Sequence, residues 1–229
     1  MVATYLLWDI DGTLIRNEFT GVSIYAQAFE RTTGALPTER PRNPHGMTEG
    51  QLLRELLAMH GHDVALHDEF RRHLDELSVE EHATGLRREQ CPGAADALAR
   101  FAEQGWRNGL LTGNAPERAR FKMLQAGYGE EPFDWEHSFF GHLSEDRHHL
   151  TSLAARALDG HRVVIIGDTP MDGAAAASAG FPFLGVGTGS FTAEELLAAG
   201  AFVAVESFES GLAAASAAIA ALPEVSPAA

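Results

Sequence analysis

The feature that most constrains the fold of this chain is a short apolar run that ends in two aspartates. Residues 6–8 are Leu, Leu and Trp, and Asp9 and Asp11 follow them one residue apart, with Gly12 next. This pattern predicts a buried strand that carries two carboxylates to the carboxyl edge of a sheet, where open α/β proteins bind ligands. Two close carboxylates repel unless a cation or a proton separates them. A solvated strand end followed by an Asp-Gly turn is the simpler interpretation.

A second strand end carries uncharged polar groups. Residues 108–114 form a short apolar stretch that ends in Thr112, Gly113 and Asn114, before a helix that Pro116 introduces. A hydroxyl group and backbone N–H groups at the start of a helix form an arrangement that suits phosphate. These residues are therefore candidates for binding an anion.

A third strand end supplies further carboxylates. Residues 163–166 are all β-branched, and Asp168 and Asp172 follow them. Unbroken apolar runs are typical of strands buried on both faces, so this strand belongs in the middle of a parallel sheet. Strands and helices alternate over the rest of the chain, which predicts an α/β fold with a doubly wound, Rossmann-like parallel sheet.

The segment after the first strand indicates a helical insertion. Helices are expected near residues 22–33 and 49–60, with Thr48 as the N-cap of the second. A third helix is expected where four apolar residues recur at helical spacing. These residues are Leu66, Phe70, Leu74 and Leu77.

Two lobes follow from this division of the chain. Residues 1–15 and 89–229 are expected to form the α/β core, and residues 16–88 the helical lobe. The chain returns to the core near Cys91, Pro92 and Gly93, where a rigid and a permissive residue suit a hinge or a turn.

Composition favours a cytoplasmic enzyme with a small-molecule partner. The chain has 229 residues, 45% of them hydrophobic, without an apolar run that could span a membrane and without a basic leader. Cys91 is the only cysteine, which agrees with a reducing compartment. A net charge of −15 argues against nucleic acid as a partner.

Two other patterns have ordinary explanations. Residues 185–190 imitate a nucleotide-binding glycine loop, but the third glycine is absent from the required position. A tight loop before a helix capped by Thr192 and Glu195 explains them better. The paired histidines lack the partners and spacing of a zinc site and fit a solvated surface.

Together, three ordered segments resemble the motifs of the haloacid dehalogenase superfamily. Residues 9–14 are similar to its first motif, residues 111–114 to its second and residues 167–172 to its fourth. The likeness spans nearly the whole chain and is to the small-molecule phosphatase branch, which includes phosphoglycolate phosphatases. The resemblance implies a Rossmann-like core with a helical cap domain inserted after the first strand.

Two residues are candidates for the basic position of the third motif. The family has a lysine there in most members, whereas this chain contains a single lysine, Lys122, on the helix after the second motif. Arg147, at the head of the helix that runs to about Asp159, occupies the equivalent position. We expect Arg147 to serve as the basic residue, with Lys122 as the alternative.

The resemblance implies a role for each motif residue. Asp9 would be the nucleophile that forms an aspartyl-phosphate, and Asp11 the acid and then the base. Mg²⁺ would be held by Asp9, Asp168 and the backbone carbonyl of Asp11, with Asp172 behind them in an orienting role. The transferring phosphoryl group would be stabilised by three donors. These are Thr112, the Gly113 N–H and Arg147.

The substrate implied by the resemblance is a small phosphorylated metabolite. Residues 45–49 resemble a cap segment of phosphoglycolate-type phosphatases. Besides Gly113 and Asn114, the candidates for substrate binding are three residues of the cap: Asn17, His45 and Thr48. The sequence identifies neither the particular substrate nor whether the protein is a monomer or a homodimer.

Related activities are separated by single residues. A dehalogenase needs no acid at position 11, and a phosphonatase needs a cap lysine that this chain lacks. A sugar phosphomutase of the same superfamily uses both aspartates and remains an alternative. A non-catalytic binding protein on the same scaffold is a third, because fold alone does not establish activity.

Overall fold

The structure is a computed structural model that describes residues 2–16, 23–42, 44 and 46–223. Its centre is a parallel sheet in which the described residues form six strands in the order β3-β2-β1-β4-β5-β6. The strands are β1 (Thr4–Trp8), β2 (Arg107–Thr112), β3 (Phe139–Phe140), β4 (Arg162–Gly167), β5 (Phe183–Val186) and β6 (Val203–Val205). The predicted doubly wound α/β class is confirmed.

Strand order and register bring the motif-bearing ends together. β1 lies between β2 and β4, and Trp8 pairs with Leu110 on one side and Ile166 on the other. The sheet grows outward in opposite directions from β1 and β4, so a crevice forms outside their carboxyl ends. The residues that follow Trp8, Leu111 and Gly167 therefore reach the same edge.

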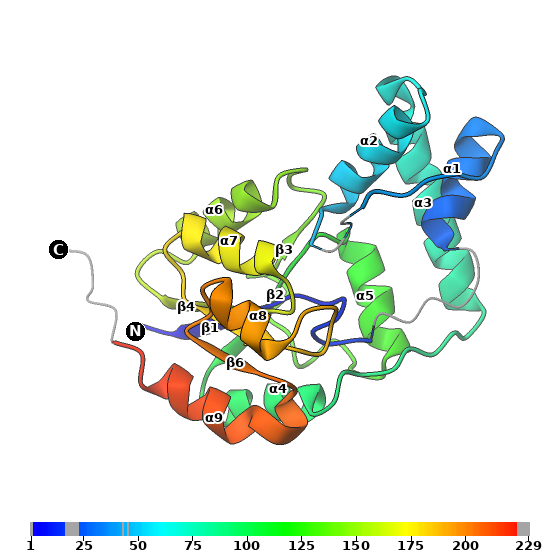
Figure 1. Cartoon of the computed structure of the whole chain (residues 1–229). Helices are drawn as coiled ribbons and strands as arrows, with labels where there is room; N and C mark the ends of the chain where they lie inside the picture. Colours follow the sequence, from blue (N-terminus) through cyan, green and yellow to red (C-terminus); the bar gives the residue numbers. More distant parts are fainter. Residues whose placement is uncertain (1, 17–22, 43, 45, 224–229) are drawn as a thin grey trace.

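Helices cover both faces of this sheet (Figure 1). On one face lie α4 (Ala94–Glu103), α5 (Pro116–Gln125) and α9 (Phe208–Ala220), and on the other α6 (Arg147–Ala157), α7 (Pro170–Ser178) and α8 (Ala193–Ala198). The capping box of Thr192 and Glu195 begins α8, as the sequence predicts.

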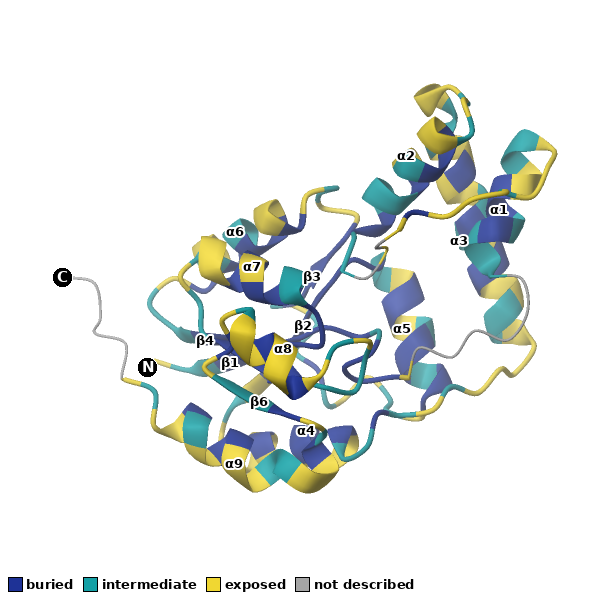
Figure 2. Cartoon of the chain, in the orientation of Figure 1, coloured by how far each residue is buried: buried dark blue, intermediate teal, exposed yellow. Residues whose placement is uncertain are grey.

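The alternation of side chains along β1 explains this layering. Leu6 and Trp8 belong to the cluster under α4, α5 and α9, whereas Tyr5 and Leu7 belong to the cluster under α6, α7 and α8. Figure 2 shows the sheet buried between the helices, whose outer faces are exposed. Complete burial of a large apolar side chain such as that of Trp8 contributes roughly 1.5–3 kcal/mol.

The helical cap is inserted between β1 and α4. It contains α1 (Ile24–Thr33), α2 (Glu49–Met59), the 3₁₀ turn η1 (Val64–Leu66) and α3 (His67–Ala83). Ser23 and Thr48 cap the first two helices by accepting from the backbone N–H groups of Ala26 and Gln51. The expected helical stripe of α3 meets the other helices in an apolar cluster of its own. That cluster includes Phe29, Leu53, Leu57, Phe70 and Leu74.

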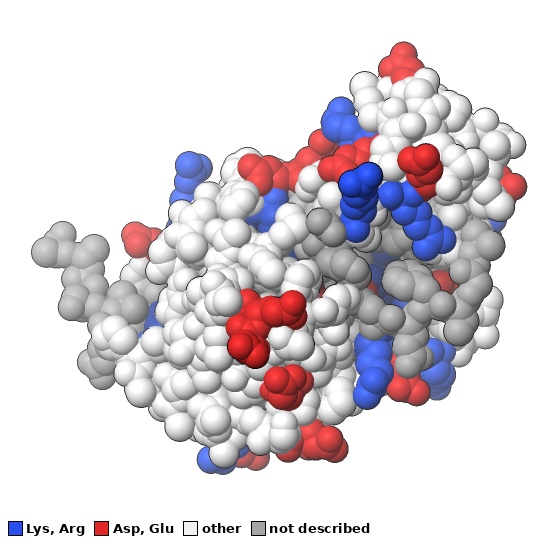
Figure 3. Space-filling model, viewed as in Figure 1, with Lys and Arg blue, Asp and Glu red and all other residues white. Residues whose placement is uncertain are grey.

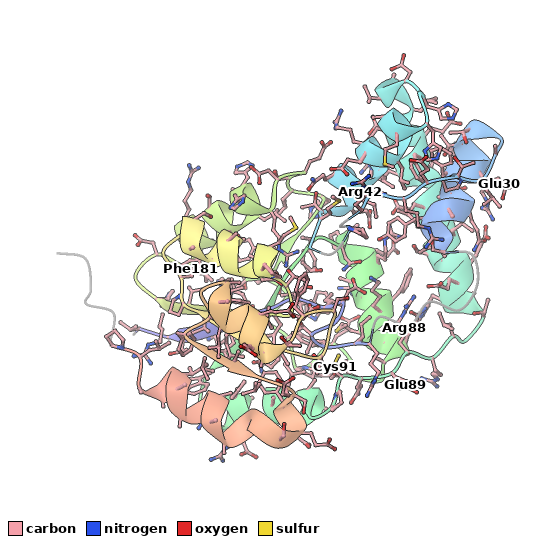
Figure 4. All side chains as sticks on the ribbon, viewed as in Figure 1. Glu30, Arg42, Arg88, Glu89, Cys91 and Phe181 are labelled. Carbon is pink, nitrogen blue, oxygen red and sulfur yellow. The ribbon has the colours of Figure 1, made fainter. Side chains whose placement is uncertain are left out.

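The two connections between cap and core run side by side. Ile15 and Gln90 form an antiparallel bridge, and the backbone N–H of Arg16 donates to the Glu89 carbonyl at 2.9 Å. Figure 4 labels Arg88 and Glu89 on the returning segment beside α5. Gly93 follows with a φ of 76°, and a Cβ there would overlap the backbone of Glu209. The permissive residue thus makes a tightly packed turn.

No helix in the described part of the chain is long and apolar enough to cross a membrane.

Candidate active site

Three buried carboxylates meet at the carboxyl edge of the sheet. Asp9 follows β1, Asp168 follows β4, and Asp172 lies in the first turn of α7. The exposed fractions of the three residues are 6%, 1% and 0%, and each residue offers a carboxylate oxygen that lies within 4.8 Å of the others. The order of the strands thus places the carboxylates of the first and fourth segments in one cluster.

This cluster is electrostatically unfavourable without added positive charge. Burial raises the pKa of Asp9 to about 6, against the influence of Arg147 and with help from Asp172 and Asp11. Burial and the charges of Asp9 and Asp172 raise the pKa of Asp168 to about 9. A cation bound among these carboxylates would reverse both shifts, because it favours their charged forms.

Arg147 supplies part of that charge. It is the first residue of α6, and its Nη2 donates to Asp9 Oδ1 at 3.1 Å and to Asp172 Oδ1. Burial alone would lower its pKa, but these carboxylates raise it, so the guanidinium stays charged. Its Nε is buried and has no hydrogen-bond partner among the described residues. One donor of this buried guanidinium is therefore left without a protein partner in the described part of the chain.

Asp172 is held by the helix it begins. Its Oδ2 accepts from the Thr169 backbone N–H at 3.0 Å and from Thr169 Oγ1 at 2.7 Å, and Thr169 Oγ1 accepts from the Asp172 N–H. This reciprocal capping box leaves Oδ1 for Arg147. The carboxylate therefore orients the arginine from a position fixed by the local sequence.

Asp168 has the free oxygen that a metal site requires. Its Oδ1 accepts from Thr13 Oγ1 at 3.0 Å, whereas the buried Oδ2 has no partner among the described residues. Glycines surround it: a Cβ on Gly12, whose φ is 89°, or on Gly189 would overlap the carboxylate. Carboxylate oxygens are ligands that Mg²⁺ prefers. The donor set thus fits a hard divalent cation.

Asp11 lies in a different electrostatic environment from Asp9. Lys122 Nζ lies 2.7 and 2.6 Å from its two carboxylate oxygens, and Asn114 Nδ2 donates to Oδ2 at 2.8 Å. Burial alone would raise the pKa of Asp11, but Lys122 and Asn114 lower it below its usual value. Lys122 also donates to Asn114 Oδ1 at 2.8 Å. Both candidate basic residues therefore lie in the site, Arg147 on Asp9 and Lys122 on Asp11.

The second motif joins the site to the cap. Thr112 Oγ1 accepts from Asn114 Nδ2 at 2.9 Å, and the Gly113 carbonyl accepts from the backbone N–H of Glu49 at 2.8 Å. A Cβ on Gly113 would overlap the Met47 carbonyl. Glycine is required here because the backbone of the cap approaches so closely.

The cap residues expected from the sequence have mixed outcomes. Thr48 is buried, caps α2 and donates to the Glu145 carbonyl at 2.7 Å, so its hydroxyl is engaged in holding the cap to the core. Asn17 and His45 lie outside the described residues.

The structure adds contacts that the sequence did not indicate. The loop at 185–190 is a tight connection, as expected, yet Thr188 Oγ1 donates to the Gly12 carbonyl at 2.6 Å and Gly189 faces Asp168. On α5, one turn before Lys122, the buried Arg118 pairs with Glu49 of α2 at 2.5 Å. The four-residue spacing of the two cations was the available signal, because it places both on one helix face.

A cavity of about 210 Å³ opens between cap and core above these residues. Its floor includes Asp9, Asp11, Lys122 and Arg147. Figure 3 shows basic and acidic side chains interspersed near the junction of cap and core, in a chain with a net charge of −15. The described lining of the cavity balances three carboxylates, Asp9, Asp11 and Glu49, with three cations, Arg40, Lys122 and Arg147, so a bound divalent cation would supply the positive charge that an anionic group needs.

The fold and site define an open α/β protein that binds its ligand at the carboxyl edge of a parallel sheet. Residues 4–180 match the sequence profile described as haloacid dehalogenase-like hydrolase. The chain therefore belongs to the haloacid dehalogenase-like hydrolase family. A search of curated protein sequences finds no significant match.

Solved structures share the fold at low sequence identity. A hydrolase from Pseudomonas syringae is 18% identical, with a TM-score of 0.68 over 95% of this chain and 99% of its own. A β-phosphoglucomutase from Clostridium difficile is 15% identical, with a TM-score of 0.68 and coverages of 96% and 98%. CbbY from Rhodobacter sphaeroides, in complex with xylulose-(1,5)bisphosphate, is 22% identical, with a TM-score of 0.63 and coverages of 92% and 96%.

Proposed function

We propose that this hydrolase is a Mg²⁺-dependent phosphatase that cleaves a small phosphorylated metabolite through an aspartyl-phosphate on Asp9. The observation that carries the proposal is the different environment of two neighbouring aspartates. Asp9 faces Arg147 and the other buried carboxylates, whereas Asp11 faces Lys122 and Asn114. A nucleophile must be ionised and an acid protonated, which is the reverse of this pKa order; a cation beside Asp9 and a phosphate dianion beside Asp11 would restore the required order.

In the first half of the proposed reaction, an oxygen of Asp9 attacks the phosphorus and the bond to the leaving oxygen breaks. Arg147 Nη2 holds the Asp9 carboxylate, and the charge of the guanidinium would stabilise the oxygens of the phosphoryl group. Mg²⁺, held by Asp9, Asp168 and the Asp11 carbonyl, would neutralise negative charge on the reacting oxygens. Thr112 and the Gly113 N–H complete the proposed phosphate site.

Asp11 gives a proton to the leaving oxygen and then accepts one from the water that hydrolyses the aspartyl-phosphate. Its first task requires the protonated form, although Lys122 and Asn114 lower its pKa in the structure. A phosphate dianion beside Asp11 would share the charge of Lys122 and add repulsion, and both effects raise the pKa of Asp11. Substrate binding itself would thus prepare the acid.

The cap, assigned here to residues 16–88, would cover the substrate during these steps. Asn114 and the cap residues Asn17 and His45 complete the proposed set for substrate binding, whereas Thr48, expected there from the sequence, has its hydroxyl engaged with the Glu145 carbonyl. The partner is a small molecule, with no role for nucleic acid or membrane. A cytoplasmic location is part of the proposal, supported by the buried free thiol of Cys91.

A sugar phosphomutase is the second candidate, favoured by the fold shared with a β-phosphoglucomutase. It would form the same aspartyl-phosphate but return the phosphoryl group to a sugar. The two activities differ in whether water or sugar receives the group. A non-catalytic binding protein would do neither.

Release of inorganic phosphate from a panel of esters tests the proposal, with sugar phosphate isomers followed alongside. We expect Mg²⁺-dependent release that Asp9→Asn abolishes and that Asp68→Asn, a change on the exposed face of α3, leaves intact. Release that persists in excess chelator or in Asp9→Asn would refute the covalent mechanism. Isomer formation with little free phosphate would establish the mutase instead.

A further inference from the structure

We propose that the leaving group of the substrate is apolar, which makes the substrate an alkyl or aryl phosphate monoester. This inference rests on the proposed phosphatase function and adds the chemistry of the part that leaves. It comes from the cap side of the cavity, whose surface differs sharply from the charged floor.

The cap side of the cavity presents mostly carbon. It is lined by prolines at 37, 41 and 44, by Ala26, and by the longer side chains of Met47, Leu52 and Leu56. The aromatic ring of Tyr25 extends the same surface. Proline lacks a backbone N–H, so this run of the cap also offers few main-chain donors to a ligand. A hydrocarbon group would be buried here without loss of hydrogen bonds.

The polar groups on this side are largely engaged. Glu49 lines the cavity, but Arg118 occupies its two oxygens at 2.5 and 2.9 Å. Ser23 Oγ accepts from the Ala26 backbone N–H as the cap of α1. The Tyr25 hydroxyl has no hydrogen-bond partner among the described residues, and burial raises its pKa, so it is a neutral group that can donate one hydrogen bond and accept another.

Arg40 is the remaining cation on the cap side, and it is exposed. No ion pair involves it among the described residues, so it could bind a second anionic group on a substrate. Its exposure places it in water, whereas Ala26, Pro41 and Leu56 of the carbon surface are buried. The interior therefore favours an apolar body over a second anion, and Arg40 supplies the competing outcome for the test.

The size of the preference for an apolar leaving group follows from the lack of hydrogen-bond partners for the hydroxyl groups of a sugar. Among the described residues of this surface, the Tyr25 hydroxyl is the main free contact, so a sugar would bring several hydroxyl groups that lose their bonds to water. In hydrophobic pockets, a single methylene changes kcat/KM by roughly 10–200-fold. We expect a preference of at least about tenfold for an apolar ester over a polyol ester of similar size.

The test compares phosphate release by the Mg²⁺-loaded protein from esters of primary alcohols. The apolar members are 3-methylbutyl and 2-phenylethyl phosphate, the polyol members are glycerol 1-phosphate and a hexose 6-phosphate, and phosphoglycolate carries a second anion. The expected result is the highest kcat/KM for the apolar members. Equal or higher values for the polyols would overturn the inference while leaving the phosphatase function intact.

A matched pair of variants locates the preference on the cap. Met47→Gln places a polar group of similar size in the cavity, whereas Met59→Gln makes the same change on the exposed end of α2. We expect Met47→Gln to raise KM for 3-methylbutyl phosphate about tenfold, with inhibition by inorganic phosphate unchanged. Met59→Gln should leave both values unchanged. Loss of phosphate inhibition in Met47→Gln would indicate damage to the floor and contradict the assignment.

Two further outcomes would overturn the inference in distinguishable ways. If phosphoglycolate is the best substrate and Arg40→Gln removes that preference, Arg40 binds a second anionic group of the substrate and the leaving group is not apolar. If no ester in the panel, apolar ones included, releases phosphate in an Asp9-dependent manner, the proposed function fails and the substrate class falls with it.

Discussion

Replacing Arg118 by methionine should destabilise the protein strongly, because this arginine is the centre of a buried ion pair between core and cap. Its side chain and that of Glu49 are 3% and 4% exposed, with Nε 2.5 Å from Glu49 Oε2. Nη2 also reaches Asp75 at 3.0 Å, and Nη1 donates to the Leu74 carbonyl at 3.1 Å. One side chain of α5 thus holds both α2 and α3.

The magnitude follows from what the substitution leaves behind. Arg118→Met would leave the Glu49 carboxylate buried without its cation, which costs roughly 3–5 kcal/mol. In a chain of this size, each kcal/mol lowers Tm by about 2–4 °C, so a decrease of roughly 6–20 °C is expected. Changing Glu49 to methionine as well should recover much of the loss, because an apolar pair carries no unpaired charge.

The assay is thermal and urea unfolding followed by both circular dichroism and tryptophan fluorescence. The three tryptophans, Trp8, Trp106 and Trp135, all lie in the core, so fluorescence reports the core whereas circular dichroism also reports the cap helices. Separate transitions by the two probes would reveal a cap that unfolds first, and each step would then be fitted separately.

The matched control is an exposed pair across the same interface. Arg54 of α2 contacts Glu145 through two hydrogen bonds of 2.7 Å, but the two side chains are 47% and 40% exposed. Arg54→Met should cost at most about 1 kcal/mol. If Arg118→Met also costs less than about 1 kcal/mol, the Arg118–Glu49 pair is solvated in solution and the buried contact between α5 and α2 is refuted.

The remaining predictions concern the site itself. Mg²⁺ should raise Tm, and the rise should grow between about pH 6 and pH 9. The pKa of Asp168 is raised, so at low pH this carboxyl group holds a proton that metal binding must displace. Asp168→Asn should abolish the rise. Gly189→Ala should weaken Mg²⁺ binding in a calorimetric titration, because its Cβ overlaps that carboxylate, and unchanged affinity would contradict the placement. Lys122→Met should move the basic limb of the kcat/KM profile to higher pH, because Asp11 must be protonated to act as the acid and burial then raises its pKa without opposition from the lysine; an unmoved limb would show that Asp11 is not the titrating group. Arg147→Ala should lower kcat about 10²–10³-fold in steady-state assays, and a loss below tenfold would exclude contact with the reacting group.

The sequence was sufficient to predict the edge of the sheet at which the site lies. Apolar runs identify the strands, and parallel strands present their following residues at one edge, so Asp9, Thr112 and Asp168 could be brought together from local patterns. The helices of the cap were also found, because each has an N-cap residue or an apolar stripe.

Contacts between helices and loops could not be predicted in the same way. Whether Lys122 reaches Asp11 depends on how α5 lies across the sheet, and local spacing does not report that angle. Likewise, Gly189 faces Asp168 only because β5 lies beside β4. The roles expected for Asn17 and His45 remain predictions, as do those of the catalytic residues.

The side-by-side connections at Ile15 and Gln90 also have a consequence for how the chain folds. β1 and β2 are neighbours in the sheet, yet Tyr5 pairs with Arg107 across roughly 100 residues. The cap helices pack around an apolar cluster of their own residues. They can therefore collapse before the sheet forms and bring residues 15 and 90 together. The loop that β1 and β2 must close would then be about a quarter as long, which lowers the entropic cost by about 1 kcal/mol. An insertion that collapses on its own thus removes most of the entropic cost that its length would impose on pairing β1 with β2.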